Sequence, residues 1–234
     1  CEHSFPTRRS SDLKNYKNTN KEGIIMNELL FKASNIIYNI NLTYNDIKIK
    51  KGKINFIVGE SGSGKSTFLK LLNQSINPDS GELLYKGLSI DTYDPIALRR
   101  EVSLVSQEPF LFNASILDNF KTFYSLRQKT MPSSDYIDYI TRLCCVNVSL
   151  DQPASTLSGG ERQRVYISIF LSLCPKVILL DEPTSALDEI TGHRVMKNII
   201  AFCKTKNIEL VIVSHNKTIV NEFCENKIEI IKEV

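Results

Sequence analysis

From Leu29 onward, short apolar runs alternate with segments in which apolar residues recur at helical spacing. The runs are short enough for buried strands, and the periodic segments are long enough for helices that cover them. We expect strands over Leu29–Ile37, Ile47–Ile49, Ile54–Val58, Glu82–Tyr85, Val102–Val105, Val177–Leu180 and Glu209–Val213. We expect helices over Ser66–Gln74, Pro95–Arg100, Ser134–Cys145, Gly160–Leu173, Glu189–Lys204 and Thr218–Cys224.

This order of elements predicts an α/β fold with a mixed, mainly parallel sheet, because strands separated by helices pair in parallel. The first strands follow one another without helices between them, which predicts an antiparallel β edge. The block from about Asn113 to Leu150 has helical periodicity and no convincing strand, so we expect an inserted α-helical lobe. We place one domain over 26–234, with its core in 26–108 and 174–234 and the helical lobe at about 109–173.

The first 25 residues do not share this pattern. Residues 3–13 resemble the conceptual translation of a common sequencing adapter, and we interpret them as an assembly scar. The competing interpretation is a basic, Ser-rich targeting tail, but the segment lacks the apolar stretch of a secretory signal. The polar stretch Lys14–Gly23 predicts a linker, and Met26 is the expected native start.

Composition narrows the class of protein. The 29 basic and 26 acidic residues give a net charge of only +3, which argues against nucleic-acid binding driven by overall charge. The six cysteines show neither a C-x-x-C pair nor a metal-ligand spacing, which favours a reduced cytosolic chain with unpaired thiols. The most apolar region, Val165–Leu180, contains Pro175 and Lys176 and therefore cannot cross a bilayer as one helix.

The most specific pattern is the run G-E-S-G-S-G-K-S-T, which fits the phosphate-loop motif G-x-x-x-x-G-K-[ST]. It lies between an expected strand and an expected helix, which is the context the motif requires. Glycines let backbone N–H groups approach phosphate oxygens, and the helix N-terminus adds partial positive charge. Lys65 can reach the β- and γ-phosphates, and the Ser66 hydroxyl can ligate Mg²⁺. We therefore expect a P-loop NTPase core whose nucleotide site contains Gly59, Glu60, Ser61, Gly62, Ser63, Gly64, Lys65, Ser66 and Thr67.

Two carboxylates directly follow the apolar run Val177–Leu180. Side chains at the C-terminal end of a parallel strand face the ligand crevice. Asp181 is placed to hold Mg²⁺ directly or through water, and Glu182 to polarise the water that attacks the γ-phosphate. An apolar run that ends in two acids is weak evidence alone, and the phosphate loop makes it strong.

A second Gly-rich helix start lies at Ser158–Gly160, within the run L-S-G-G-E-R-Q-R. Backbone N–H groups and the helix dipole make such a start an anion site. The alternative is a flexible turn followed by a helix that Ser158 caps. Since a chain with one phosphate loop does not obviously need a second phosphate-binding helix start, we expect this one to serve the nucleotide of another copy.

These motifs occur in the order and rough spacing of the ATP-binding-cassette ATPases, which the chain resembles from about Leu29 onward. The resemblance rests on the phosphate loop, Gln107, L-S-G-G-E-R-Q-R, L-L-D-E-P-T-S-A-L-D and His215, and the S-G-G-E signature is specific to that family. It implies that two such domains pair head to tail around two ATPs. Each ATP would contact the phosphate loop of one domain and the signature of the other, formed by Ser158, Gly159, Gly160 and Glu161.

The resemblance also implies roles for residues outside these runs. Gln107 would contact Mg²⁺ and the attacking water and thereby sense the γ-phosphate. His215 would hydrogen-bond the γ-phosphate and help position Glu182. Asp188 would reach across the dimer.

The family also has an aromatic residue that stacks on adenine, and the resemblance assigns that role to Tyr38. The stretch from Tyr38 to Leu42 is short for the family, so Tyr44 stays open as an alternative. An aromatic near an edge strand is more often a packing residue than a platform for a base.

As a whole, the resemblance implies a Mg-dependent ATP hydrolase that energises transport through a separate membrane permease, in the cytoplasm at the inner face of the cell membrane. A domain cut from a fused exporter and a soluble ATPase that acts on chromosomes, DNA repair or ribosomes remain open alternatives. The run Gln107–Ile116 is exporter-like, whereas Gln152–Thr156 replaces a segment typical of exporters. The short separation of Lys65 and Ser158 leaves no room for the coiled coil of the chromosome type.

The apolar stretch Pro109–Phe112, with Ile116 and Phe120, has two interpretations. It is either the groove that receives a coupling helix of the permease or the core of the helical lobe. Exposed apolar patches and core positions look alike in a sequence, so both stay open.

Overall fold

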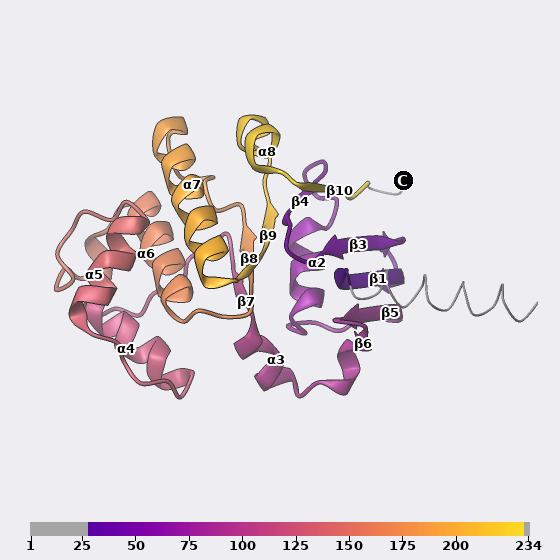
Figure 1. The fold of residues 1–234 in the computed structure, drawn as a ribbon, viewed down its shortest axis with the longest axis horizontal. Helices are drawn as coiled ribbons and strands as arrows, with labels where there is room; N and C mark the ends of the chain where they lie inside the picture. The colour runs from indigo at the N-terminus through magenta and orange to yellow at the C-terminus, as the bar shows by residue number, and fades with distance from the viewer. Residues whose placement is uncertain (1–27, 232–234) are drawn as a thin grey trace, which may run out of the picture.

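The computed structural model describes residues 28–231 (Figure 1). Its strands are β1 (Leu29–Tyr38), β2 (Leu42–Tyr44), β3 (Ile47–Lys50), β4 (Ile54–Val58), β5 (Ser80–Tyr85), β6 (Leu88–Ser89), β7 (Val102–Val105), β8 (Val177–Asp181), β9 (Glu209–Val213) and β10 (Asn226–Glu229). Its helices are α2 (Lys65–Leu72), α3 (Pro95–Glu101), α4 (Ile116–Leu126), α5 (Ser134–Leu143), α6 (Gly159–Ser172), α7 (Glu189–Lys206) and α8 (Lys217–Phe223). Short 3-10 turns cover Ile90–Thr92 and Ala154–Thr156. The expected scar, linker and native start lie outside the described residues.

The central sheet is parallel, with the strand order β10-β4-β9-β8-β7. Strand β9 lies between β4 and β8, and its Val213 pairs with Ile57 on one side and with Asp181 on the other. The phosphate loop that follows β4 and the carboxylates at the end of β8 therefore lie at the same edge of the sheet, as expected for the carboxyl ends of parallel strands.

The expected antiparallel strands form a sheet of their own instead of an edge of the parallel sheet. Its order is β2-β1-β5-β6, and β3 also pairs with β1. The α/β fold class is confirmed, and the difference lies in the pairing. In Figure 1 these strands lie on the right of the molecule, with α2 between them and strands β7, β8 and β9 of the parallel sheet.

The run Val177–Leu180 of β8 is continuously apolar because its alternate side chains are buried on opposite faces of the sheet. Val177 and Leu179 join the hydrophobic cluster that contains α2 and the antiparallel sheet, whereas Ile178 and Leu180 join the cluster that contains α4 to α8. All of these β8 side chains are fully buried. A strand covered on both faces has no polar side, so period-two alternation disappears.

The block expected to be helical contains α4 and α5, which pack with α6 on the far side of the parallel sheet (Figure 1). Of the stretch with two interpretations, Leu111, Ile116 and Phe120 are buried in this cluster and belong to the core. Phe110 is 60% exposed and does not. Within the described range, none of the helices combines the length and apolar character that a membrane crossing needs.

Candidate nucleotide-binding site

The phosphate loop joins the end of β4 to the start of α2. Gly64 caps α2 with a φ of 90°, in the left-handed region that favours glycine. A Cβ atom at this position would lie 2.6 Å from the Tyr44 hydroxyl, which itself donates a hydrogen bond to the Gly64 carbonyl at 2.9 Å. The glycine is thus required both by its conformation and by the close approach of β2.

Lys65 is the first residue of α2 and is only 6% exposed. Its Nζ donates to the carbonyl oxygens of Gly59 at 3.1 Å and Glu60 at 2.6 Å, so the ammonium group folds back over the loop. Burial lowers the pKa of Lys65, and the nearby carboxylates of Glu182 and Asp181 oppose that shift. The ammonium group therefore lies beside the phosphate loop, where it could interact with a bound phosphate.

Ser66 and Asp181 meet across the site. The Ser66 hydroxyl donates to Oδ1 of Asp181 at 3.0 Å. Burial raises the pKa of Asp181, and the hydrogen bond from Ser66 opposes that shift. These oxygens suit Mg²⁺, which is usually held by one or two carboxylates together with waters and substrate phosphates. The described residues contain no group of three or more His, Cys, Asp or Glu that could cage a metal ion, so the fit is to an ion bound together with a nucleotide.

Glu182 follows Asp181 and is 8% exposed. Its Oε2 accepts the backbone N–H of His215 at 3.3 Å, and its Oε1 lies 3.0 Å from Nε2 of His215. Oε1 itself is buried and makes no hydrogen bond to the described residues. Burial raises the pKa of Glu182, and His215 opposes that shift.

A pocket of about 340 Å³ opens above the loop. It is lined by Leu42, Ser61, Gly62, Gly64, Lys65, Ser66, Thr67, Gln107, Glu182, Val213 and His215. The structure thus brings the phosphate loop together with Gln107, Glu182 and His215, the three residues expected to take part in hydrolysis. Sequence reasoning missed Leu42 and Val213, because an apolar residue beside a loop carries no motif.

The signature residues do not line this pocket. Ser158 is the N-cap of α6 in a capping box with Glu161. Oε2 of Glu161 accepts the Ser158 N–H at 2.9 Å and hydroxyl at 2.7 Å, and these bonds lower the pKa of Glu161. Ser158 and Gly159 are exposed. The capped-helix interpretation is therefore correct, and the first-turn N–H groups of a capped helix still lack intrahelical acceptors.

Asp188 is likewise away from the pocket. It caps α7, and its Oδ1 accepts the backbone N–H of Thr191 at 2.9 Å. The carboxylate is exposed, which leaves it accessible to a neighbouring molecule.

The structure distinguishes between the two tyrosines that were candidates for stacking on adenine. Tyr44 is 2% exposed, and its ring packs against Phe68 with centroids 4.9 Å apart, so neither face is free for a base. Tyr38 is half-buried at the end of β1 and does not line the pocket. Tyr44 is thus excluded as a platform, and Tyr38 stays a prediction.

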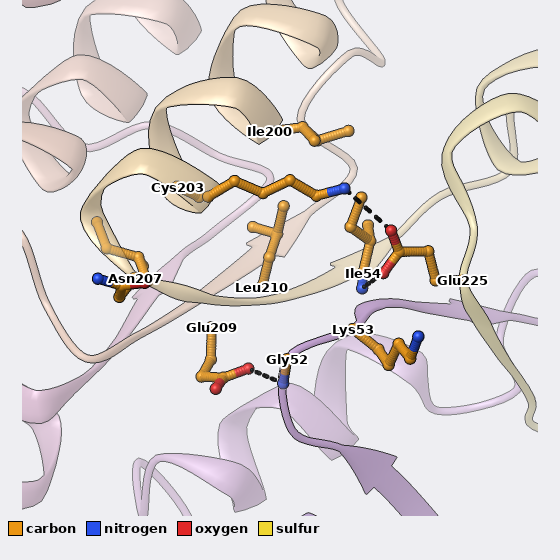
Figure 2. A pocket seen from close by; sticks show the side chains of 11 residues that line it. Gly52, Lys53, Ile54, Ile200, Cys203, Asn207, Glu209, Leu210 and Glu225 are labelled. Carbon is orange, nitrogen blue, oxygen red and sulfur yellow. Dashed lines mark hydrogen bonds and ion pairs between the residues drawn. The ribbon is translucent and has the colours of Figure 1, made fainter.

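Another pocket, of about 330 Å³, lies at the opposite edge of the parallel sheet (Figure 2). There Glu209 accepts the Gly52 N–H at 2.8 Å, and Glu225 accepts the Ile54 N–H at 3.0 Å. Glu225 also pairs with Lys204 at 3.0 Å. The carboxylates of Glu209 and Glu225 thus hold the chain at the start of β4. None of the motif residues lines this pocket.

Comparison with known proteins shows the family of the chain. Residues 42–185 match the family model described as ABC transporter. The chain is 36% identical over 186 residues to the probable iron export ATP-binding protein FetA of Escherichia coli (strain K12), covering 80% of each protein. It is 40% identical over 211 residues to the phosphate import ATP-binding protein PstB of Saccharolobus solfataricus, covering 79% of this chain and 80% of that protein.

A solved structure gives the same result. The fold is similar to that of CbiO1 from Clostridium perfringens, part of the ABC transporter complex cbiONQ, with a TM-score of 0.73 and 28% identity. The match covers 86% of this chain and 84% of that one. The matches therefore indicate the same family as the sequence motifs, which are the phosphate loop, the carboxylates after β8 and the signature helix. The chain belongs to the ABC transporter family and is one of its ATP-binding proteins.

Proposed function

We propose that the chain binds and hydrolyses ATP in the cytoplasm, at the inner face of the cell membrane, and energises transport through a separate permease. The relatives support the ATP-driven cycle, because FetA is named for iron export, PstB for phosphate import, and CbiO1 for membership of a transporter complex. Since these names include both export and import, they support neither a substrate nor a direction for this chain. Its partners in this proposal are a permease and a second ATP-binding subunit, identical or closely related.

One observation carries the proposal: the chain contains two Gly-rich helix starts that do not share a pocket. The phosphate loop opens into the pocket with Glu182 and His215, whereas Ser158 and Asp188 are exposed elsewhere. A single chain therefore presents an open pocket and an exposed helix start at separate places. Head-to-tail pairing of two chains would supply each with the other.

Within each site, we assign binding to the phosphate loop and to Asp181, Gln107 and Tyr38. Backbone N–H groups of residues 59–67 and the Lys65 ammonium would hold the β- and γ-phosphates. Ser66 and Asp181, joined by Gln107, would hold Mg²⁺, which when bound neutralises charge on the phosphate oxygens. Tyr38 would contact the adenine.

Glu182 is the proposed proton acceptor for the attacking water. A carboxyl group whose pKa is raised by burial is a better proton acceptor than a fully solvated one, provided that it stays ionised. The imidazole of His215 favours the ionised form of Glu182. In this assignment His215 both steadies Glu182 and contacts the γ-phosphate.

The rate of ATP hydrolysis at increasing protein concentration tests the proposal. Turnover per chain should rise with concentration and then level off, because two chains must meet before either site is complete. The Ser158→Arg variant should bind ATP and show little hydrolysis at any concentration. Constant turnover per chain at dilutions where sedimentation detects only monomers would contradict the proposal.

A further inference from the structure

The backbone of Glu182 is held in a conformation that it would not adopt freely. Its φ is +48°, in the left-handed region that is uncommon for residues with a Cβ atom. Such a conformation persists only where surrounding groups impose it, and it is found most often at functional sites.

Hydrogen bonds hold this residue at both ends. Its N–H donates to the carbonyl of Val213 at 3.0 Å. Its carbonyl accepts from Oγ of Ser185 at 3.0 Å, from N–H of Ser185 at 3.2 Å, and from Nε2 of Gln163 at 2.9 Å. Of the bonds to this carbonyl, only the one from Gln163 comes from a distant element.

Gln163 lies in the second turn of α6 and is 2% exposed. Its amide nitrogen is used by Glu182, while its Oε1 is buried and has no hydrogen-bond partner among the described residues. A buried amide with one unsatisfied end costs stability, so packing alone does not explain the residue. An apolar side chain would fill the position without that cost.

The start of α6 also packs closely against the segment that follows Glu182. A Cβ atom added at Gly160 would lie 2.9 Å from the carbonyl oxygen of Ala186 and 3.0 Å from Leu187. Helix α6 is therefore in contact with this segment near Ser158 and again at Gln163. A displacement of the helix at one end would be transmitted to the backbone of Glu182.

We propose that Gln163 is a positioning residue, which holds Glu182 in its left-handed conformation and links it to the Ser158 end of α6 in the same chain. This inference rests on the proposed role of Glu182 in hydrolysis. Contact of Ser158 with the nucleotide of a second chain would then act on the orientation of the first chain's own Glu182. The two ATP sites of a pair would be connected through α6.

The test is the Gln163→Met variant, which removes the donor together with the unpartnered acceptor. The kcat for ATP should fall about 10- to 100-fold, as for a misplaced catalytic group, while the Kd for ATP stays within about twofold. In the Glu182→Gln background the same substitution should cause no further loss. A fall of equal size in both backgrounds, or an unchanged kcat, overturns the proposal.

Asn198→Leu is the matched control, because the Asn198 amide donates to the carbonyl of Leu143 at 2.8 Å, away from the pocket. Amide hydrogen exchange provides a readout that does not depend on activity. Residues 182–187 should exchange faster in Gln163→Met and not in Asn198→Leu. An unchanged exchange rate overturns the proposal even if the wild type hydrolyses no ATP, and that last result would itself contradict the proposed function.

Should Gln163→Met fail to fold, Ser185→Ala removes the other side-chain donor to the same carbonyl from an exposed position. It should accelerate exchange over the same segment and lower kcat without changing the Kd for ATP. If Ser185→Ala leaves both exchange and kcat unchanged, the hydrogen bonds to this carbonyl do not position Glu182, and the proposal fails.

Discussion

Both carboxylate oxygens of Glu182 face His215: Oε2 accepts its backbone N–H at 3.3 Å, and Oε1 lies 3.0 Å from its Nε2. Glu182 follows β8 and His215 follows the neighbouring strand β9. The orientation of the carboxylate therefore depends on the pairing of two adjacent parallel strands. The phosphate loop follows β4, the strand on the other side of β9. The side chain of His215 is 52% exposed and that of Glu182 is 10% exposed, so the imidazole lies on the solvent side of the pair.

Replacing Glu182 by Gln should lower the rate of ATP hydrolysis by about 10²- to 10⁴-fold, because the attacking water loses its proton acceptor. Binding of ATP should persist, since the amide has the same size and the phosphate loop is intact. Size-exclusion chromatography with ATP should then show a stable dimer. Hydrolysis near the wild-type rate would remove Glu182 from the proposed role.

His215→Ala should lower kcat by about 10²-fold, the size expected when a group that orients a general base is removed. His193→Ala is a matched control, because His193 forms a comparable pair with Glu222, at 2.8 Å, outside the pocket. The control should keep its turnover. Equal losses in the two variants, measured by steady-state kinetics, would show that His215 has no special relation to hydrolysis.

Lys65→Ala should weaken ATP binding about 10- to 100-fold, since one charge-assisted contact contributes roughly 1.5–3 kcal/mol. Direct titration by calorimetry measures this change without any need for turnover. Lys48→Ala, on an exposed position of β3, should bind ATP as the wild type does. Identical affinities for the wild type and Lys65→Ala would contradict the placement of Lys65 against the phosphates.

The buried thiols should be chemically inert. Burial raises the pKa of Cys203 to about 12 and moves that of Cys144 in the same direction, so both stay protonated at neutral pH. Cys174 is exposed. Maleimide followed by peptide mapping should label Cys174 in the native protein and leave Cys144 and Cys203 unlabelled up to about pH 9. In guanidinium chloride all three should react, and labelling of Cys203 in the native state would contradict its burial.

Those features that depend on contiguous residues were predictable from the sequence. The bounds of β4, β7 and β9 match their expected ranges, because each is a short apolar run closed by polar or turn residues. The phosphate loop is one uninterrupted motif between a strand and a helix. Asp181 and Glu182 likewise follow directly from the end of a single apolar run. The local sequence pattern therefore predicted the phosphate loop and both carboxylates.

The remaining features depend on residues that are distant in the sequence. Strand β10 was missed because it is an edge strand in which only Ile228 is buried, so its apolar signal is too weak. The separate antiparallel sheet could not be distinguished from an antiparallel edge of the parallel sheet, because the sequence of a strand does not show which strand it pairs with. For the same reason, the burial of Tyr44 and the contact of Gln163 with Glu182 appear only once α2 and α6 are packed.

The central claim is that each ATP is hydrolysed between two chains, and mixing two inactive variants tests it most directly. Lys65→Ala disables the pocket of its own chain, and Ser158→Arg disables the surface offered to a partner. A mixed pair contains one complete site of its two, and half of the pairs are mixed, so an equal mixture should recover ATPase activity up to about a quarter of the wild-type rate. A mixture that stays as inactive as its two folded components would contradict the shared site.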